Sequence, residues 1–210
     1  MINVVCVLRQ GGKVGYDATW VEKLKNSVAR NLTLEHRFIC LSDVDVPCEC
    51  IPLISHNAGF WAKLELFRPK LFNDPVLYID LDTVICANID NIINQIKDQQ
   101  FVMLLETDKI VVSSAVMWWQ GDHSYLWDRY LEIPSEEIKE KYSKMPRYGD
   151  QAFIEDYTKH TVLQDHIPAE WVGWASQREV SADTKILIFR KVSQKPSTML
   201  NHPLVQKHWY

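Results

Sequence analysis

The stretch VLYIDLDTVI, residues 76–85, places two carboxylates directly after a run that is typical of a buried strand. Asp80 and Asp82 are two positions apart, so on an extended chain both side chains project to one side and Leu81 to the other. Burying an ionised carboxylate is costly, and two close together raise each other's pKa. A divalent cation would remove their repulsion, and carboxylate oxygens favour Mg²⁺ or Mn²⁺. Such ions complete their shells with water and phosphate oxygens, so a nucleotide diphosphate is the ligand we expect.

The residues around this stretch alternate between strand and helix patterns. Residues 2–8, INVVCVL, form a continuous apolar run, as expected for a strand covered on both faces. After a loop, Asp17 can cap a helix over residues 18–31. Strand, loop, helix and strand in this order begin an open α/β sheet. We predict strands at 2–8, 36–43, 76–81, 101–106, 113–119 and 186–190, helices at 18–31, 59–68, 90–98 and within 123–158, and a loop after residue 192.

Several polar residues follow these predicted strands. The loop 9–16 comes after the first, Asp43 ends the second, and Asp80 and Asp82 end the third. Ligands of open α/β sheets bind outside the carboxyl ends of the strands. An Asp-x-Asp triplet alone is as easily a solvated strand end. Its place after a buried strand favours a ligand site.

The composition is that of a globular domain. The chain has 210 residues, enough for one large domain, of which 47% are hydrophobic and 24% charged. A formal net charge of −4 argues against nucleic acid as the main partner, because phosphate binding needs a basic surface. No signal peptide or membrane-spanning run is visible, and five cysteines, an odd number, favour a reducing compartment. We therefore expect a cytoplasmic protein.

The segment FWAKLELFRPKLFNDPVLYIDLDTVICANID, residues 60–90, resembles the nucleotide-sugar-dependent glycosyltransferases with the GT-A fold. More narrowly, it is similar to the retaining, glycogenin-like group and related bacterial and viral enzymes. There an aromatic-Ala-Lys/Arg-Leu helix precedes a Leu-Tyr-Ile/Leu-Asp-x-Asp strand. The likeness extends over most of the chain. VVCVLRQG (4–11) resembles the family's first strand and nucleotide loop, SSAVMWW (113–119) its Asn-Ser-Gly-Val-Met segment, and GDQAFI (149–154) its Asp-Gln motif.

The resemblance implies an α/β fold of the GT-A type, a Rossmann-like open mixed β-sheet flanked by helices. It implies one domain over 1–210, with a nucleotide-binding half of about 1–106 and a donor-sugar and acceptor half of about 107–210. A viral relative would work in the host cytoplasm, and further domains could belong to a longer chain.

The resemblance also implies roles for single residues. In the family the two motif carboxylates hold Mn²⁺, which bridges the donor's phosphates, so Asp80 and Asp82 are the expected metal ligands and Asp82 the firmer one. Asp150 and Gln151 match the motif beside the donor sugar. The expected catalytic residues are Asp150, Gln151 and Lys63, and the expected nucleotide- and donor-binding residues are Leu8, Arg9, Tyr16, Asp43, Lys63, Asp80, Leu81, Ser113, Ser114 and Lys195.

Each role has a structural alternative. Lys63 could be a surface lysine with a buried stem, and Tyr16 a core residue. Asp43 could form a turn, and Asp150 could cap a helix. Ser113 stands where the family has asparagine, which leaves its role open.

The C-terminal part departs from the family pattern. Many relatives have a His-x-x-Gly-x-x-Lys-Pro segment whose histidine is the third metal ligand, whereas FRKVSQKP, residues 189–196, keeps only Lys195 and Pro196. Lys195 is expected to meet the diphosphate. The third ligand is missing or comes from elsewhere, with His202 as one candidate. Trp171 and Trp174 could stack on an acceptor sugar or simply pack in the core.

Together these observations predict a metal-dependent glycosyltransferase. It would transfer a hexosyl group from a UDP-sugar, UDP-glucose-like, to a hydroxyl of a glycan acceptor, with retention and with Mn²⁺ or Mg²⁺ as cofactor. One alternative is a catalytically disabled module that still binds nucleotide sugars. Another is a metal-dependent nucleotidyltransferase, which also pairs carboxylates around a metal.

Overall fold

A computed structural model describes residues 1–11, 14–56, 59–106, 111–144, 147–191 and 193–210. Its centre is a seven-stranded mixed sheet with the order β3-β2-β1-β4-β7-β6-β8. β1, β2, β3 and β4 run parallel to one another, β7 is antiparallel to both its neighbours, and β8 is parallel to β6. The strands are β1 (Ile2–Leu8), β2 (His36–Ser42), β3 (Glu49–Pro52), β4 (Val76–Ile79), β6 (Phe101–Leu105), β7 (Val112–Trp119) and β8 (Thr161–Val162).

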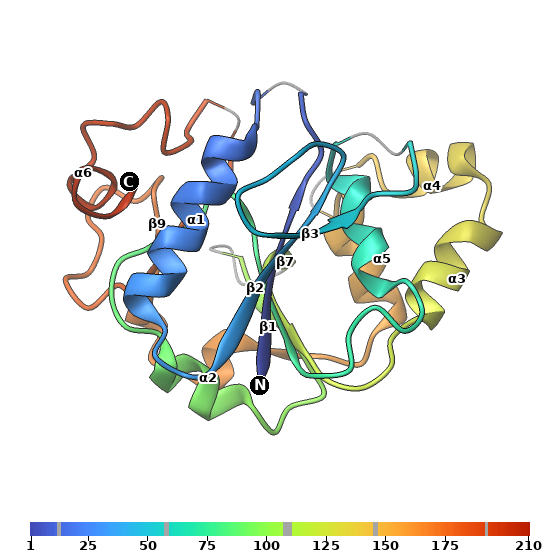
Figure 1. Ribbon diagram of the computed structural model, residues 1–210, viewed down its shortest axis with the longest axis horizontal. Coiled ribbons are helices and arrows are strands. Elements are labelled where there is room, and N and C mark those ends of the chain that lie inside the picture. The colour runs from blue at the N-terminus through green and yellow to red at the C-terminus, as the bar shows by residue number, and fades with distance from the viewer. Residues whose placement is uncertain (12–13, 57–58, 107–110, 145–146, 192) are drawn as a thin grey trace.

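Helices cover both faces of this sheet (Figure 1). One face is packed by α1 (Ala18–Asn31) and α2 (Asp90–Ile96), whose isoleucines, leucines and valines join those of β1 and β4 in one apolar cluster. The other face is packed by the 3₁₀ helix η1 (Gly59–Phe67), α3 (Tyr125–Glu132) and α5 (Gly149–Tyr157) in an aromatic-rich cluster. α4 (Ser135–Lys141) adds to that side. Because both faces are covered, the strands are almost continuously apolar.

A smaller sheet lies beside the main one. It has the order β5-β10-β9, built from β5 (Val84–Ile85), β9 (Val172–Trp174) and β10 (Ile186–Ile188). The short 3₁₀ helices η2 (Leu163–Asp165) and η3 (Ala169–Trp171) precede β9, and α6 (Pro203–His208) follows β10. The C-terminal segment then packs on α1, where Trp209 meets Trp20 edge to face at 5.2 Å between ring centroids.

The predicted mixed α/β architecture with helices on both faces is confirmed, and five predicted strands lie in the main sheet. Three expectations were wrong. β3 forms an edge strand where no strand was predicted, and α6 interrupts the tail predicted as a loop. The strand predicted over 76–81 ends at Ile79. No helix in the described residues is both long and apolar enough to cross a membrane.

Candidate functional site

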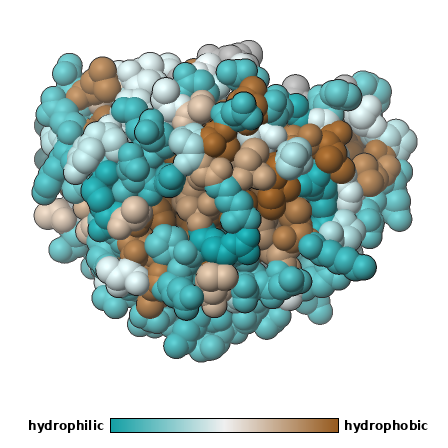
Figure 2. Space-filling view, viewed as in Figure 1, coloured by the Kyte–Doolittle hydropathy of each residue, from teal (hydrophilic) through white to brown (hydrophobic). Residues whose placement is uncertain are grey.

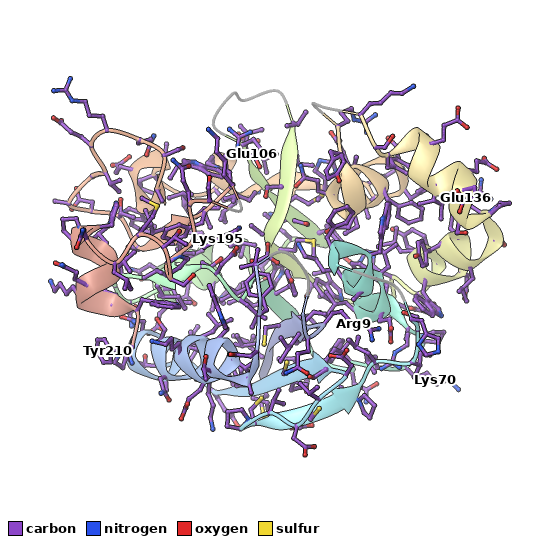
Figure 3. The ribbon with its side chains drawn as sticks, turned by 90° about the horizontal axis from the view of Figure 1, so that it is seen from above. Arg9, Lys70, Glu106, Glu136, Lys195 and Tyr210 are labelled. Atoms are coloured by element: carbon purple, nitrogen blue, oxygen red, sulfur yellow. The ribbon has the colours of Figure 1, made fainter. Side chains whose placement is uncertain are left out.

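A cavity of about 470 Å³ opens at the carboxyl ends of β1 and β4, and Lys195 of the C-terminal segment also lines it. The outer face beside it is mostly hydrophilic, with hydrophobic residues gathered between α1 and the helices on the other side (Figure 2). Seen from above, Arg9 and Lys195 both lie near the centre of the molecule, although they come from opposite ends of the sequence (Figure 3). The lining residues are Val7, Arg9, Gln10, Gly11, Val14, Tyr16, His56, Gly59, Phe60, Lys63, Tyr78, Asp80, Leu81, Asp82 and Lys195.

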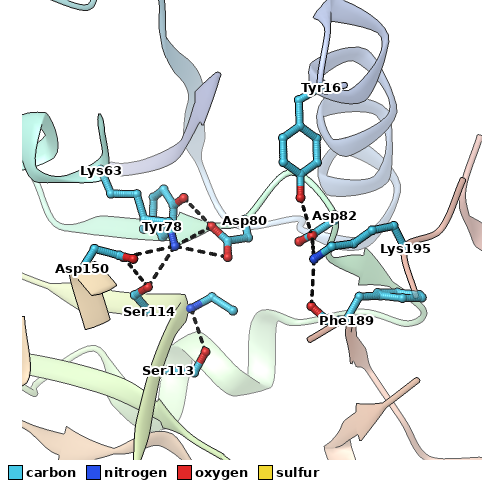
Figure 4. Close-up of polar contacts among 11 residues, drawn as sticks. Tyr16, Lys63, Tyr78, Asp80, Asp82, Ser113, Ser114, Asp150, Phe189 and Lys195 are labelled. Carbon is cyan, nitrogen blue, oxygen red and sulfur yellow. Dashed lines mark hydrogen bonds and ion pairs between the residues drawn. The ribbon is translucent and has the colours of Figure 1, made fainter. Parts of the chain in front are cut away.

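The Asp-Leu-Asp triplet forms a turn rather than the end of a strand. The amide of Asp80 still donates to the carbonyl of Ala115 at 2.8 Å, but the amide of Thr83 closes a turn onto the carbonyl of Asp80 at 3.0 Å. All three residues of the triplet line the cavity, while Leu81 also belongs to the buried apolar cluster on the α1 side of the sheet. Each carboxylate faces its own set of partners (Figure 4).

Lys63 joins four elements around Asp80. Its ammonium on η1 lies 2.9 Å from Asp80 after β4, 3.3 Å from Asp150 on α5 and 2.8 Å from the Ser114 hydroxyl on β7. Ser114 in turn donates to Asp150 at 2.6 Å, and the Tyr78 hydroxyl donates to Asp80 at 2.5 Å. The Lys63 side chain is 12% exposed and lies between two carboxylates, so it is a largely buried cation and the surface-lysine alternative is wrong.

Asp82 has different partners. The Tyr16 hydroxyl donates to its Oδ2 at 2.6 Å, and the ammonium of Lys195 forms an ion pair with the same oxygen. Asp82 and Lys195 are 5% and 7% exposed, so this pair lies at the buried base of the cavity. Asp80 and Asp82 therefore each contact a lysine, Lys63 and Lys195 respectively.

A third charged group lies on the β1 side of the cavity. The guanidinium of Arg9 contacts Asp43 at 3.1 Å and also donates to the carbonyl of Ser55. Asp43 accepts from the amide of Gln10 at 2.8 Å. The loop at Ser55 is held by the buried carboxylate of Glu65, which accepts from two backbone amides and the Ser55 hydroxyl. Arg9 is thus positioned by Asp43 and, through Ser55, by Glu65.

Burial and neighbouring charges shift several pKa values here. Burial, together with the charge of Asp82, raises the pKa of Asp80 despite the opposing effect of Lys63. Burial alone would lower the pKa of Lys63, but the carboxylates of Asp150 and Asp80 raise it above its ordinary value. Burial and the contact with Asp82 raise the pKa of Tyr16, so its hydroxyl stays protonated as a donor. The site therefore contains a firmly charged lysine and a neutral tyrosine at neutral pH.

Most sequence-predicted residues come together at this cavity, and a few do not. Arg9, Tyr16, Lys63, Asp80, Leu81, Asp82 and Lys195 line it, while Asp43, Ser114 and Asp150 bond directly to lining residues. Leu8 is fully buried behind the lining, and the hydroxyl of Ser113 accepts from the amide of Ala115. Gln151 is half-buried and makes no hydrogen bond to these groups among the described residues.

Three further candidates lie away from the cavity. His202 is the N-cap of α6, where its Nδ1 accepts from the amide of Leu204 at 3.3 Å, and it is not among the residues that line the cavity. Trp174 is buried in the core. Trp171 packs against that core with the Lys185 ammonium 4.2 Å from its ring centroid. The core-packing alternative therefore holds for both tryptophans.

Sequence reasoning missed Tyr78, Glu65, Phe60 and His56. Tyr78 carried a usable signal, because residues two apart on a strand share a face and it stands two before Asp80. Glu65 gave none, since one glutamate in a helical segment is normally solvated.

Asp80 and Asp82 form a donor set that fits Mg²⁺ or Mn²⁺. Such ions are commonly bound by one or two carboxylates and complete their shells with water and substrate phosphates. Within the described part of the chain, no cluster of three or more His, Cys, Asp or Glu side chains is arranged to hold a metal ion. Oδ1 of Asp82 has no partner among the described residues, so one oxygen is available to a cation.

No protein-family model and no curated protein matches the chain. Solved structures match it in fold. The glycosyltransferase GlyE of Streptococcus pneumoniae TIGR4 superimposes with a TM-score of 0.64 at 12% identity, over 93% of this chain and 56% of GlyE. The galactosyltransferase LgtC, solved with donor and acceptor sugar analogues, gives 0.57 at 12% identity over 99% of this chain and 96% of LgtC.

A glycosyltransferase involved in the glycosylation of the major capsid of PBCV-1 is also similar, with a TM-score of 0.54 at 14% identity over 89% of this chain and 91% of that one. The fold is therefore the GT-A glycosyltransferase fold. The chain spans nearly the whole of LgtC and about half of GlyE.

Proposed function

We propose that this protein is a glycosyltransferase that takes a hexosyl group from a UDP-sugar, UDP-glucose-like, and joins it to a hydroxyl of a glycan acceptor with the help of Mn²⁺ or Mg²⁺. The bond between the anomeric carbon and the diphosphate breaks, and a bond from that carbon to the acceptor oxygen forms. The proton of the acceptor hydroxyl passes to the departing diphosphate or to solvent, and UDP is the second product.

One observation carries this proposal. In a GT-A fold, a single cavity at the carboxyl ends of β1 and β4 gathers Arg9, Lys63, Lys195 and the Asp80–Asp82 pair. Three cations and two carboxylates at one cavity suit a ligand that combines a diphosphate with a hydroxyl-rich sugar.

The nucleotide is expected on the β1 side of the cavity. The Tyr16 ring is positioned by an edge-to-face contact with Trp20 at 4.9 Å and can stack on a uracil base. Arg9 can bind a phosphate through the planar fork of its guanidinium. Asp43 would then keep that guanidinium oriented, because it already contacts one of its nitrogens at 3.1 Å.

The donor sugar is expected beside Lys63. Asp150 is 4% exposed and hydrogen-bonded to Ser114, so it is a fixed acceptor for sugar hydroxyls. Lys63 donates to both Asp80 and Asp150, so its positive charge offsets the repulsion between the two carboxylates. Gln151 is the next residue on α5, and its role beside the donor sugar rests on the sequence motif alone.

Asp80 and Asp82 would hold the metal ion. When bound, Mn²⁺ or Mg²⁺ stabilises the negative charge that develops on the departing diphosphate. The chain's own contribution is to keep both carboxylates at one cavity. Retention of the anomeric configuration rests on the sequence resemblance alone.

A nucleotide-sugar-binding protein without turnover is the alternative. The ion pair of Lys195 with Asp82 favours it, since a lysine already neutralises the firmer expected metal ligand. Turnover of any UDP-sugar would exclude this alternative.

Release of UDP from a panel of UDP-sugars, with Mn²⁺, with Mg²⁺ and with EDTA, tests the proposal. We expect metal-dependent release with one donor, and a loss of about a hundredfold in Asp82→Asn with an unchanged circular dichroism spectrum. Full activity of Asp82→Asn would contradict the assigned site. Release from no donor would contradict the transferase.

A further inference from the structure

Lys195 reaches the site from a segment more than a hundred positions away from Asp82 in the chain. Its ammonium forms an ion pair with Oδ2 of Asp82 and donates to the carbonyl of Phe189 at 3.2 Å (Figure 4). The residue is only 7% exposed, so little water screens this pair. A divalent cation bound through the other oxygen of Asp82, Oδ1, would share this carboxylate with the ammonium.

The position of Lys195 is built by the local chain. The hydroxyl of Thr198 accepts from the Lys195 amide at 3.0 Å, and the amides of Thr198 and Met199 donate to the Lys195 carbonyl at 2.9 Å each. The side chain therefore extends from a hydrogen-bonded turn. Its direction toward Asp82 is a property of the fold at this point.

The charges around the triplet are already nearly balanced. Asp80, Asp82 and Asp150 carry three negative charges, against the ammoniums of Lys63 and Lys195. A divalent ion placed on Asp82 would meet a buried ammonium bound to the same carboxylate. Two positive charges on one carboxylate repel strongly when water is excluded. A metal ion that binds the free protein must therefore displace the Lys195 ammonium or bind against its repulsion.

We propose that Lys195 is an internal counter-cation that competes with the divalent metal for Asp82, so that metal binds weakly to the free protein and tightly only together with a diphosphate. This inference rests on the proposed function, because it concerns the same cavity. The diphosphate supplies negative charge that attracts the displaced ammonium and also ligates the metal. Metal and nucleotide then strengthen each other's binding by the same factor.

The test measures Mn²⁺ binding directly, by calorimetry and by the loss of the free Mn²⁺ signal in electron paramagnetic resonance, with no nucleotide present. Lys195→Met removes the charge, and Lys195→Gln removes it but keeps a donor for Asp82, which protects against misfolding. We expect both variants to bind Mn²⁺ at least about tenfold more tightly than the wild type, the size of effect that one neighbouring charge has on proton binding. Equal or weaker binding in a folded variant, or undetectable binding in all proteins, would overturn the proposal.

Two matched variants separate charge from other effects. Lys97→Met makes the same change in net charge at an exposed position outside the cavity and should leave Mn²⁺ affinity unchanged. Tyr16→Phe removes the other hydrogen bond to Oδ2 of Asp82 but leaves the ammonium, and should change affinity less than the lysine variants. An equal gain in Tyr16→Phe would mean that crowding at Oδ2 of Asp82, and not the lysine's charge, limits the affinity for Mn²⁺.

Nucleotide linkage gives a second measurement. Adding UDP should raise Mn²⁺ affinity more in the wild type than in Lys195→Gln, because the variant has no ammonium to displace. The same gain in both proteins would overturn the competition. Neither titration needs sugar transfer. The inference can therefore fail while turnover of a UDP-sugar still supports the proposed function. It can also hold in a protein that turns over no UDP-sugar.

Discussion

Glu65 is a fully buried carboxylate that supports the site indirectly. It accepts from the amide of Ile54 at 2.8 Å, from the amide of Ser55 at 2.9 Å and from the Ser55 hydroxyl at 2.5 Å, and it lies 3.5 Å from the guanidinium of Arg68. The Ser55 carbonyl in turn accepts from Arg9. Glu65 is therefore a positioning residue for the arginine expected to bind phosphate.

Glu65→Gln replaces one of the accepting oxygens by an NH2 group, which can only donate. Buried amides that now donate to that oxygen would lose their partner. Because hydrogen bonds to a charged group contribute about 1.5–3 kcal/mol each, we expect a loss of at least about 2 kcal/mol in the free energy of unfolding. Urea denaturation measures it. UDP affinity should fall as well, since Arg9 loses its support.

Glu22→Gln is the matched control, because Glu22 is exposed on α1 and the same chemical change should be nearly neutral there. A stable Glu65→Gln variant with wild-type UDP affinity would contradict the positioning role.

At the residue scale, part of the site could be predicted from sequence. Asp80 and Asp82 follow an apolar run that predicts a strand, and the family resemblance adds Lys63 to the expected site. The partners of these residues could not be predicted. The ion pair of Lys195 with Asp82 joins positions 113 apart, and only the folded chain decides that contact.

At the scale of elements, the start of α5 carries a tight constraint. Gly149 has φ +70°, and a Cβ there would lie 2.8 Å from the ring of Phe60, which lines the cavity. Glycine meets both conditions because it has no Cβ. The close approach places Asp150, the next residue, beside Lys63.

Gly149→Ala should therefore both strain the backbone and push Phe60 aside. We expect a loss of about 1–3 kcal/mol in the free energy of unfolding and weaker UDP-sugar binding, measured by thermal melting and calorimetry. Gly121→Ala, at φ +81° with its nearest neighbour 3.9 Å away, carries the backbone strain alone. Equal losses in the two variants would contradict the steric contact with Phe60.

The chain before α3 carries a group that makes stability depend on pH. His123 packs edge to face on Phe101 at 5.0 Å between ring centroids, and burial lowers its pKa below the ordinary value. The unfolded chain then takes up a proton more readily than the folded one. This histidine therefore contributes stability above about pH 6.5 that is lost as the pH falls through its folded pKa.

His123→Gln should flatten that dependence. We expect a smaller difference in the urea midpoint between pH 7.5 and pH 5.0 than in the wild type. Part of the slope should remain, because burial also lowers the pKa values of His202 and His208. Identical slopes in the two proteins would show that His123 is not responsible.

The elements predicted correctly are those with long local patterns. Six of the seven residues of β1 are apolar. α1 has a capping aspartate that accepts from the amide of Thr19 and a buried face of Val21, Leu24 and Val28. The missed strands are short and depend on distant partners. β3 is a four-residue, largely exposed edge strand that ends in proline, and β5 pairs with β10 about a hundred positions later.

At the scale of the whole molecule, the site is assembled from both ends of the chain. The end of β1 supplies Arg9, the turn after β4 supplies the carboxylates, and the segment after β10 supplies Lys195. That segment ends against α1, where the Lys23 ammonium lies 4.0 Å from the Trp209 ring centroid. Ligand binding should therefore stabilise the whole fold and not one part of it.

The most direct measurement is the melting temperature against a panel of UDP- and GDP-sugars, with and without Mn²⁺, for the wild type and Asp82→Asn. A ligand at a hundred times its dissociation constant adds about 2.7 kcal/mol, which is a shift of several degrees. We predict a shift that needs both Mn²⁺ and one UDP-sugar and is lost in Asp82→Asn. No shift with any nucleotide sugar, or the same shift in both proteins, would contradict a metal-dependent nucleotide-sugar site at Asp80 and Asp82.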